Sequence, residues 1–504
     1  MHEGKRLSIP RLFLGLLILG AISYGAFLGW NKIKAEKPTI QSNPWFAPYV
    51  DITATPSFSF EQTDNASINK NIVLSFIVSD STNPCTPSWG NAYTINDANS
   101  KLDLDRRIAR FRQLGGNIAI SFGGQLNDEL AINCTKESDL YNAYKSVIAH
   151  YSVDTIDLDI EGSNLQNKDA MKRRADTIAK LQKDMKNQNK SLAVWLTLPV
   201  APNGLTEDGT DAITTMLNSG VDLAGVNVMT MDYGTLPANG SLQEANTDAL
   251  NNTHRQLGIL YDNAGIHLNS ASIWGKIGAT PMIGQNDTED EVFTLDDAKV
   301  LNTFIEQNQI ARLSMWSANR DIECGENYVN TQIVSDSCSG VKEDKFAFSN
   351  LLQAGLSGKI SDSAAKTTVA DQKDIETPDD PATSPYQIWS ADATYLEGTK
   401  IVWHHNVYVA KWWTQGDLPD NPVLQSFQTP WQLVGPVLPG ETPIPVPTVA
   451  PGTYPQWSGT AIYEAGSKVI LNGVPYQAKW WTQGDSPAAS RENPDSSPWV
   501  AINP

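Results

Sequence analysis

Between about residue 46 and residue 352, short runs of apolar residues alternate with longer stretches in which apolar residues recur at helical spacing. Uninterrupted apolar runs are typical of strands buried on both faces, as in a parallel sheet covered by helices. The eight runs that we expect to be strands are residues 46–53, 71–80, 116–124, 155–162, 192–202, 223–234, 271–284 and 312–321. Helical patterns lie between them, for example at 170–187 and 295–309.

Eight strands alternating with helices predict an α/β fold, in the form of a closed (β/α)8 TIM barrel rather than an open doubly wound sheet. No GxGxxG sequence follows the first predicted strand, which argues against a dinucleotide-binding sheet. We therefore expect residues 43–358 to form one barrel, with an active site at the carboxyl ends of its strands.

The chain changes character after the barrel. Residues 359–385 are polar and acidic, and residues 436–453 are rich in proline, so both are predicted to be linkers. The segments 386–435 and 454–504 repeat each other at a constant offset of 68 positions, and each contains the sequence AKWWTQGD. Two copies are too few for a solenoid, so we expect two small all-β modules with aromatic residues in their cores.

The N-terminal sequence indicates that the protein is exported. Residues 12–30 form a run of 19 residues without a charge, preceded by Lys5, Arg6 and Arg11. Such a run can span a bilayer, and its short basic lead favours a cytoplasmic N-terminus. No small-residue cleavage site follows it. We expect residues 1–42 to be a membrane anchor or a signal segment, and the remainder to be extracellular or periplasmic, held at the inner membrane if the anchor is retained.

The cysteines fit an oxidising compartment. Cys85, Cys134, Cys324 and Cys338 are even in number and all follow the apolar run. Three pairings exist, and buried free thiols are the alternative. We favour 85–134 and 324–338, because the first two would lie in loops after neighbouring strands and the last two in a single loop.

Charge and composition exclude several functions. The net charge is −19, so the surface repels phosphate backbones and we expect no nucleic-acid binding. The six histidines form no HExxH sequence and the cysteines form no CxxC sequence, so we expect neither a metal nor another cofactor.

The segment 154–162, with the sequence DTIDLDIEG, is the most informative one. On a strand, Asp157, Asp159 and Glu161 share one face, so they would face the barrel interior with Glu161 at the carboxyl rim. Three carboxylates in a row repel one another, so at least one must hold or share a proton near neutral pH. A carboxyl group that keeps its proton at an open rim can act as a general acid. A solvated acidic edge strand is the alternative, but it leaves the apolar residues between the acids unexplained.

This segment resembles the DGxDxDxE signature of glycoside hydrolase family 18, the chitinase family, with Thr155 in place of the glycine. The family's SxGG signature on the preceding strand is matched by Ser121, Gly123 and Gly124. Trp316, in the last predicted strand, corresponds to the family's tryptophan under the sugar ring at the cleavage site.

One family motif is only partly matched. The sixth strand of the family carries Met-x-Tyr-Asp, whereas this chain has Met231 in place of the tyrosine, followed by Asp232. The family tyrosine holds the substrate's acetamido oxygen, and Tyr233 or another hydroxyl would have to replace it. The resemblance therefore implies six substrate-binding residues, namely Ser121, Gly123, Gly124, Asp232, Tyr233 and Trp316.

The resemblance also implies a mechanism, in which the substrate's own N-acetyl oxygen attacks the anomeric carbon and configuration is retained. Glu161 would protonate the glycosidic oxygen and then act as base for the attacking water. Asp159 would orient the acetamido group, and Asp157 would share its proton.

The repeated segments resemble the small chitin-binding modules of bacterial chitinases. In each module, one tryptophan of the adjacent pair would point into the core and the other outward, where it can stack on sugar rings; the alternative is that all the aromatics are core. The residues expected to bind chitin are Tyr408, Trp412, Trp413, Tyr476, Trp480 and Trp481.

We therefore expect an exported, monomeric chitinase that binds chitin and N-acetylglucosamine oligosaccharides and meets a membrane only through its N-terminal segment. Only 27 residues separate Gly284 from Arg312, too few for the extra domain that walls the cleft of processive relatives, so we expect an open, endo-acting cleft. The alternatives are a non-hydrolytic chitin-binding lectin and an endo-β-N-acetylglucosaminidase acting on N-glycans or peptidoglycan.

Overall fold

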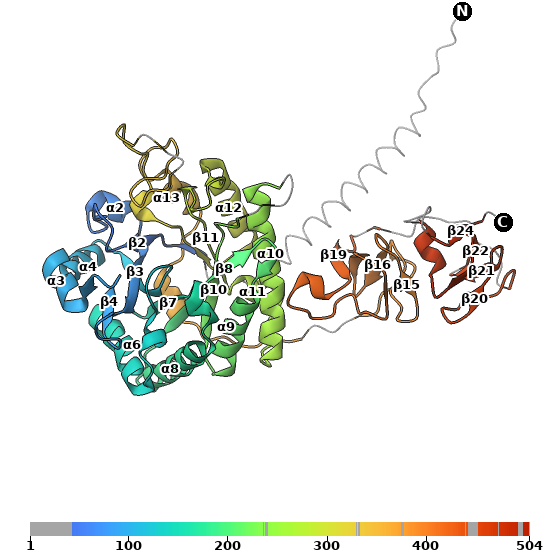
Figure 1. Ribbon diagram of the computed structural model, residues 1–504, viewed down its shortest axis with the longest axis horizontal. Helices are drawn as coiled ribbons and strands as arrows, with labels where there is room; N and C mark the ends of the chain where they lie inside the picture. The colour runs from blue at the N-terminus through green and yellow to red at the C-terminus, as the bar shows by residue number, and fades with distance from the viewer. Residues whose placement is uncertain are drawn as a thin grey trace, which may run out of the picture.

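The structure is a computed structural model that describes residues 43–502 apart from 235, 237–239, 329, 331–332, 374–376, 439, 442–451, 472 and 492–496. The predicted N-terminal segment and most of the predicted proline-rich linker lie outside the described residues. Within the described residues, no helix is long and apolar enough to cross a bilayer. Figure 1 shows a barrel wrapped by helices, followed by two small β modules.

The parallel strands form a closed ring, as predicted. Its first position is split into β1 (Trp45–Phe46), which pairs with the last strand, and β2 (Tyr49–Asp51), which pairs with the second. The other seven positions are β3 (Asn71–Ser79), β6 (Asn117–Gly123), β7 (Thr155–Asp159), β8 (Ala193–Ala201), β10 (Leu223–Met229), β11 (Ile277–Thr280) and β14 (Arg312–Leu313). Shorter strands extend the loops: β4 (Pro87–Trp89), β5 (Tyr93–Thr94), β9 (Gly204–Leu205), β12 (Gly284–Gln285) and β13 (Val292–Phe293).

Helices cover the outside of the ring. The long ones are α4 (Leu104–Gln113), α6 (Glu137–Tyr151), α8 (Lys168–Asn187), α9 (Glu207–Asn218), α10 (Leu242–Asn263) and α12 (Leu295–Asn308). The short ones are α2 (Thr63–Ile68), α3 (Ile95–Leu102), α5 (Leu130–Asn133), α7 (Gly162–Gln166), α11 (Ser270–Trp274), η1 (Ala318–Arg320), α13 (Ala347–Leu352) and α14 (Ile360–Ala364). The prediction of one strand over 271–284 was wrong in part, because its first residues form α11.

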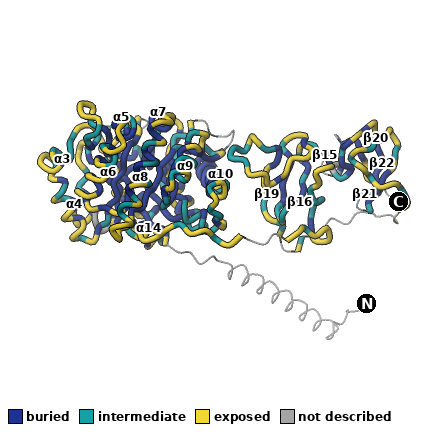
Figure 2. Tube along the Cα trace, turned by 90° about the horizontal axis from the view of Figure 1, so that it is seen from below, coloured by how far each residue is buried: buried dark blue, intermediate teal, exposed yellow. Residues whose placement is uncertain are grey.

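The alternation of side chains along the barrel strands separates two hydrophobic cores, one outside the ring and one inside it. Ile156, Leu158 and Ile160 pack outward into the large cluster between strands and helices. Inside the ring, Tyr49 and Trp195 belong to a second, smaller cluster. Figure 2 shows the buried residues concentrated in the strands and inner helix faces of the barrel, with a small buried centre in each module.

The barrel domain is longer than predicted, because the first part of the expected linker 359–385 is docked on it. Ile360 is 1% exposed and belongs to the cluster inside the ring. The indole of Trp45 donates a hydrogen bond to the hydroxyl of Ser363 (3.2 Å), and Asp371 N–H donates to the carbonyl of His267 (2.7 Å). Two apolar residues four positions apart, Ile360 and Ala364, are enough to bury α14 in a segment whose overall composition is polar.

The two repeats form equivalent modules. The first contains β15 (Thr394–Tyr395), β16 (Lys400–Trp403), β17 (Asn406–Ala410), β18 (Thr414–Gln415), η2 (Ser426–Gln428) and β19 (Trp431–Pro436). The second contains β20 (Ile462–Tyr463), β21 (Lys468–Leu471), β22 (Val474–Ala478), β23 (Thr482–Gln483), η3 (Pro487–Arg491) and β24 (Trp499–Ala501). Each folds into a two-stranded and a three-stranded sheet over an aromatic core.

The modules pack on their neighbours. Thr394 N–H of the first module donates to the carbonyl of Gly484 of the second (3.1 Å), and Trp457 packs against the cores of both. The first module contacts the barrel through Leu424, whose carbonyl accepts hydrogen bonds from Arg255 and Gln256 of α10 (both 2.9 Å). A proline-rich connection therefore joins parts that also touch directly.

Candidate active site

Strand β7 carries the three predicted carboxylates to the rim. Asp157 and Asp159 lie in the strand, and Glu161 follows it as the residue that precedes α7. The backbone of Glu161 is still extended (φ −130°, ψ 165°), so the alternation of the strand continues past its last hydrogen-bonded residue. The three side chains therefore share the inner face, as predicted.

Asp157 is the deepest of the three, and four side chains hold it. Its carboxylate accepts hydrogen bonds from the hydroxyls of Tyr49 (2.8 Å), Ser121 (2.7 Å) and Thr197 (2.7 Å) and from the guanidinium of Arg312 (2.6 Å). The four donors come from β2, β6, β8 and β14. Asp157 is thus fixed by strands from all around the ring, and its ion pair with Arg312 compensates its burial.

Asp159 is buried and has a free carboxyl oxygen that faces the site. It is 5% exposed, and its Oδ1 has no hydrogen-bond partner among the described residues. Burial raises the pKa of Asp159 well above its usual value, and the charges of Glu161 and Asp157 raise it further. The raised pKa favours the protonated form of Asp159 next to the other two carboxyl groups.

Glu161 titrates near neutrality. Burial raises its pKa from 4.5 to about 7, helped by the negative charges of Asp232 and Asp287. Asp232 was predicted to belong to the site, whereas Asp287 was not, because it lies in a loop after the seventh strand without any recognisable motif. A carboxyl group that is half protonated at neutral pH can both donate and accept a proton during one catalytic cycle.

The SxGG residues lie beneath the carboxylates and contact strand β7, which gives them a positioning role; contact with substrate stays a prediction. Ser121 is fully buried and donates to Asp157. Gly123 (φ 105°) passes so close to β7 that a Cβ atom would lie 2.0 Å from the carbonyl oxygen of Asp159, and Gly124 N–H donates to that same oxygen (2.8 Å). These residues place the carboxylates, and only glycine allows the close approach.

An aromatic surface borders the carboxylates. Trp316 is partly exposed, and its ring stacks on Phe76, with centroids 5.5 Å apart and planes inclined by 18°. Tyr49 lies next to both rings. Trp316 was predicted, but Phe76 was missed, although an aromatic residue near the carboxyl end of a barrel strand was visible in the sequence.

The hydroxyl of Tyr233, the predicted replacement for the missing family tyrosine, points to α10, and its role toward substrate stays a prediction. Its hydroxyl donates to the side-chain oxygen of Asn246 on α10 (2.8 Å), and its N–H donates to Glu291 (3.1 Å). Asp232, by contrast, is held at the rim, where its Oδ1 accepts a hydrogen bond from Thr288 N–H (2.7 Å).

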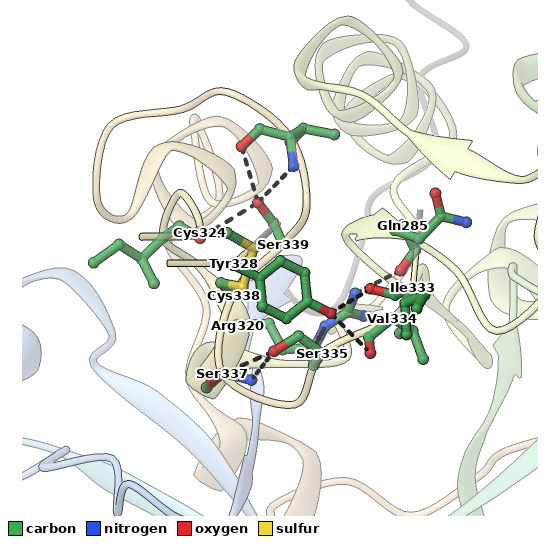
Figure 3. Close-up of a disulfide and its surroundings, with 12 residues drawn as sticks. Gln285, Arg320, Cys324, Tyr328, Ile333, Val334, Ser335, Ser337, Cys338 and Ser339 are labelled. Carbon is green, nitrogen blue, oxygen red and sulfur yellow. Dashed lines mark hydrogen bonds between the residues drawn. A yellow bond between two sulfur atoms is a disulfide. The ribbon is translucent and has the colours of Figure 1, made fainter. Parts of the chain in front are cut away.

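The loop closed by the disulfide Cys324–Cys338 supports the part of the rim that carries Asp232 and Asp287. Both predicted disulfides are present, Cys85–Cys134 and Cys324–Cys338. Figure 3 shows the guanidinium of Arg320 between the carbonyls of Ser335, inside the second disulfide loop, and Gln285 of β12. Burial lowers the pKa of Arg320 to about 10, against the opposing effect of Asp287, the residue two positions after Gln285. Arg320 therefore ties the loop to the strand end that carries Asp287.

The tryptophan pairs of the modules are exposed on the surface. Trp412 is 44% exposed and Trp413 57%; in the second module the values are 45% for Trp480 and 55% for Trp481. The prediction that one member of each pair enters the core was wrong, because both pairs lie just beyond the ends of β17 and β22. The equivalent tyrosines are core residues instead of binding residues: Tyr408 is 8% exposed and Tyr476 2%.

Comparisons with known proteins agree with this architecture. Residues 456–500 match carbohydrate-binding module family 5/12. The chain is 33% identical over 348 residues to a probable bifunctional chitinase/lysozyme of Escherichia coli K12, covering 64% of this chain and 36% of that protein. It is 32% identical over 309 residues to endochitinase 11 of Metarhizium anisopliae, covering 59% and 56%. The chain thus spans only part of these two relatives.

A solved structure is similar as well. The catalytic domain of a hyperthermophilic chitinase from Pyrococcus furiosus has a TM-score of 0.53 and 28% identity, covering 65% of this chain and 99% of that domain. The comparison confirms the predicted fold class, a (β/α)8 barrel of the kind found in chitinase catalytic domains, followed by small all-β modules. In the described part of the chain, no three His, Cys, Asp or Glu side chains are arranged so that they could hold a metal ion.

Proposed function

We propose that the chain is a chitinase, which hydrolyses the β-1,4 linkages between N-acetylglucosamine units with retention of configuration. The observation that carries the proposal is the pair of carboxyl groups at the end of β7: a buried Asp159, whose pKa is raised, beside Glu161, whose pKa is about 7. A general acid works best with a pKa near the working pH. The relatives from Escherichia coli, Metarhizium and Pyrococcus are all described as chitinases, which supports the same reaction.

The reaction begins with proton transfer. Glu161 donates its proton to the glycosidic oxygen while the acetamido oxygen of the same sugar attacks the anomeric carbon, so that the leaving sugar departs and an oxazolinium ion forms. The open Oδ1 of Asp159 accepts the acetamido N–H and holds the oxygen in line for attack. Glu161, now a carboxylate, takes a proton from water as that water opens the ring.

The surrounding residues position the sugar. Trp316 and Phe76 offer a stacked aromatic surface for the sugar ring at the cleavage point. Asp157, paired with Arg312, stays fixed beneath Asp159 and keeps that carboxyl group in place as the oxazolinium ion develops.

The proposal extends to the way the enzyme meets its substrate. The exposed tryptophan pairs of both modules bind chitin by stacking, and the short excursion between β11 and β14 leaves the cleft open for endo-type cleavage. Residues 1–42 export the chain and anchor it to a membrane. The enzyme acts as a monomer and needs no cofactor.

Peptidoglycan is a second candidate substrate. The Escherichia coli relative is described as a chitinase and lysozyme, and both polymers carry N-acetyl groups beside β-1,4 linkages. Substrate-assisted chemistry requires only that N-acetyl group at the cleaved sugar.

The decisive experiment compares wild type, Glu161→Gln and Asp159→Asn on crystalline chitin, soluble chitooligosaccharides, peptidoglycan and fully deacetylated chains. Glu161→Gln should lower turnover by about 10²–10⁴-fold while substrate binding persists, because glutamine keeps the shape but has no acidic proton. Asp159→Asn should also be severely impaired. The exposed Asp154, at the other end of β7, supplies a matched control in Asp154→Asn, which should stay active. Efficient cleavage of deacetylated chains would rule out the mechanism.

A further inference from the structure

A cavity lies at the end of the barrel opposite Glu161. It has a volume of about 780 Å³ and is bordered by the second half of α8, the end of α9 and the segment after α14. Leu192 and Leu223, at the starts of β8 and β10, also line it, so it belongs to the amino-terminal end of the strands. The cavity shares no residue with the active site.

Five lysines surround this cavity, although the chain carries a net charge of −19. We refer to them as the basic face: Lys180, Lys183, Lys186, Lys190 and Lys366. All five are exposed. Within the described part of the chain none of them forms an ion pair, so their charges are available to a partner.

The acidic side chains that line the cavity have partners other than these five lysines. Asp176 pairs with Lys172 and accepts a hydrogen bond from Ser219, and Asp222 accepts from the hydroxyl and N–H of Thr368. A lysine in the last turn of α8 complements the helix dipole, but that effect does not account for Lys366, which comes from a separate segment. The face is therefore positive on balance.

The described chain begins beside the basic face. Gly358 N–H donates to the carbonyl of Pro44 (3.0 Å), and Trp45 donates to Ser363 of α14, the helix whose end lines the cavity. The N-terminal segment therefore joins the barrel at this same end. Twelve residues, 31–42, separate the apolar run from the described chain, a reach of at most about 40 Å.

We propose that the basic face binds the anionic phospholipid headgroups of the membrane in which residues 12–30 are anchored, which turns the catalytic rim away from the bilayer. This inference rests on the proposed membrane anchoring and is independent of the polymer that is hydrolysed. A lysine near an anionic membrane strengthens binding about fivefold. The acidic remainder of the molecule is repelled by the same membrane, so that both effects favour one orientation.

The test uses the full-length chain in nanodiscs made either of phosphatidylcholine alone or of phosphatidylcholine with phosphatidylglycerol. Amine-reactive labelling, followed by mass spectrometry, measures the accessibility of each lysine. In anionic discs, Lys183, Lys186 and Lys190 should react at least about threefold more slowly than in neutral discs, and high salt should remove the difference. Lys136, at the start of α6 near the rim and with a side chain 73% exposed, is the internal control and should react equally in both.

A charge-reversed variant sharpens the result. Lys183→Glu/Lys186→Glu/Lys190→Glu changes only exposed positions, so it should fold and hydrolyse soluble oligosaccharides as wild type does. In this variant, Lys180 and Lys366 should lose their protection in anionic discs. Lys136→Glu, as matched control, should keep the protection of the basic face.

Equal labelling in both discs, or protection that survives in the charge-reversed variant, would overturn the proposal. It would also be overturned if inorganic phosphate protected these lysines as well as anionic discs do, because the partner would then be a soluble anion. A chain that associates with neither disc would refute both the anchor and the proposal. Hydrolysis measured in the same samples reports separately on the proposed activity.

Discussion

Removing the charge of Glu161 should stabilise the protein by an amount that grows as the pH rises above about 4.5 and levels off above about 7. The unfolded chain loses this proton near pH 4.5, whereas the folded protein keeps it to about pH 7. Between these values the folded state binds more protons than the unfolded state, so the free energy of unfolding falls as the pH rises and stays lowered above about 7. Glu161→Gln never carries the charge and escapes this loss.

The magnitude follows from the two pKa values. The interval between 4.5 and about 7, at about 1.4 kcal/mol for each pH unit, corresponds to an upper limit of about 3 kcal/mol. Burial is its first cause, and the neighbouring Asp232 and Asp287 supply the rest. The gain from Glu161→Gln should therefore approach this limit well above pH 7 and vanish near pH 4.5.

The assay is urea unfolding followed by far-ultraviolet circular dichroism, at pH about 5 and about 8.5, for wild type and Glu161→Gln. Glu326→Gln, at an exposed position near the second disulfide, is the control and should change stability at neither pH. A stability difference that is the same at both pH values would refute the reasoning, since it would come from packing and not from the charge.

Four further outcomes are expected. Arg312→Met should lower the free energy of unfolding by about 3–5 kcal/mol, because it leaves a buried carboxylate without its counter-charge; Arg106→Met, on the surface, should cause no measurable change in the same denaturation experiment. The kcat/KM for a soluble oligosaccharide should fall about tenfold for each pH unit above about 7, as Glu161 loses its proton, and a flat profile to pH about 9 would contradict this assignment. Removal of 437–504 should weaken adsorption to insoluble chitin and leave soluble turnover nearly intact; equal losses would mean that the module supports the barrel instead. Trp413→Ala should reduce adsorption to chitin in a pull-down assay without changing soluble turnover, since this ring is exposed and remote from the carboxylates.

The parts of the site that lie on one strand were predictable from the sequence. The alternation of Asp157, Asp159 and Glu161 with apolar residues fixes their common face without any knowledge of the tertiary structure. The closed ring followed in the same way from eight apolar runs. The residues that surround these acids could not be predicted from the sequence. Asp287 and Arg320 come from loops after different strands, and only the folded chain brings them together.

Local sequence was a poor guide to the structure in two places. The segment that begins at residue 359 is polar on average, yet burial of Ile360 and Ala364 together with the hydrogen bond from Trp45 to Ser363 holds it on the barrel. Neighbouring residues of a strand point to opposite faces, but the tryptophan pairs lie beyond the strand ends, where that rule does not hold.

The packing of the modules has a consequence for the behaviour of the enzyme on a crystal. The second module contacts the first, and the first contacts α10. The distance between the tryptophan pairs of the modules and the active-site cleft is therefore set by the fold. A molecule bound to a crystal face through both modules reaches only the chitin chains within the fixed distance between modules and cleft. Both modules must dissociate before it can cut elsewhere. For the proposed activity on solid chitin, we therefore expect release from the surface to limit turnover, so that tighter binding by a module would slow the degradation of the crystal.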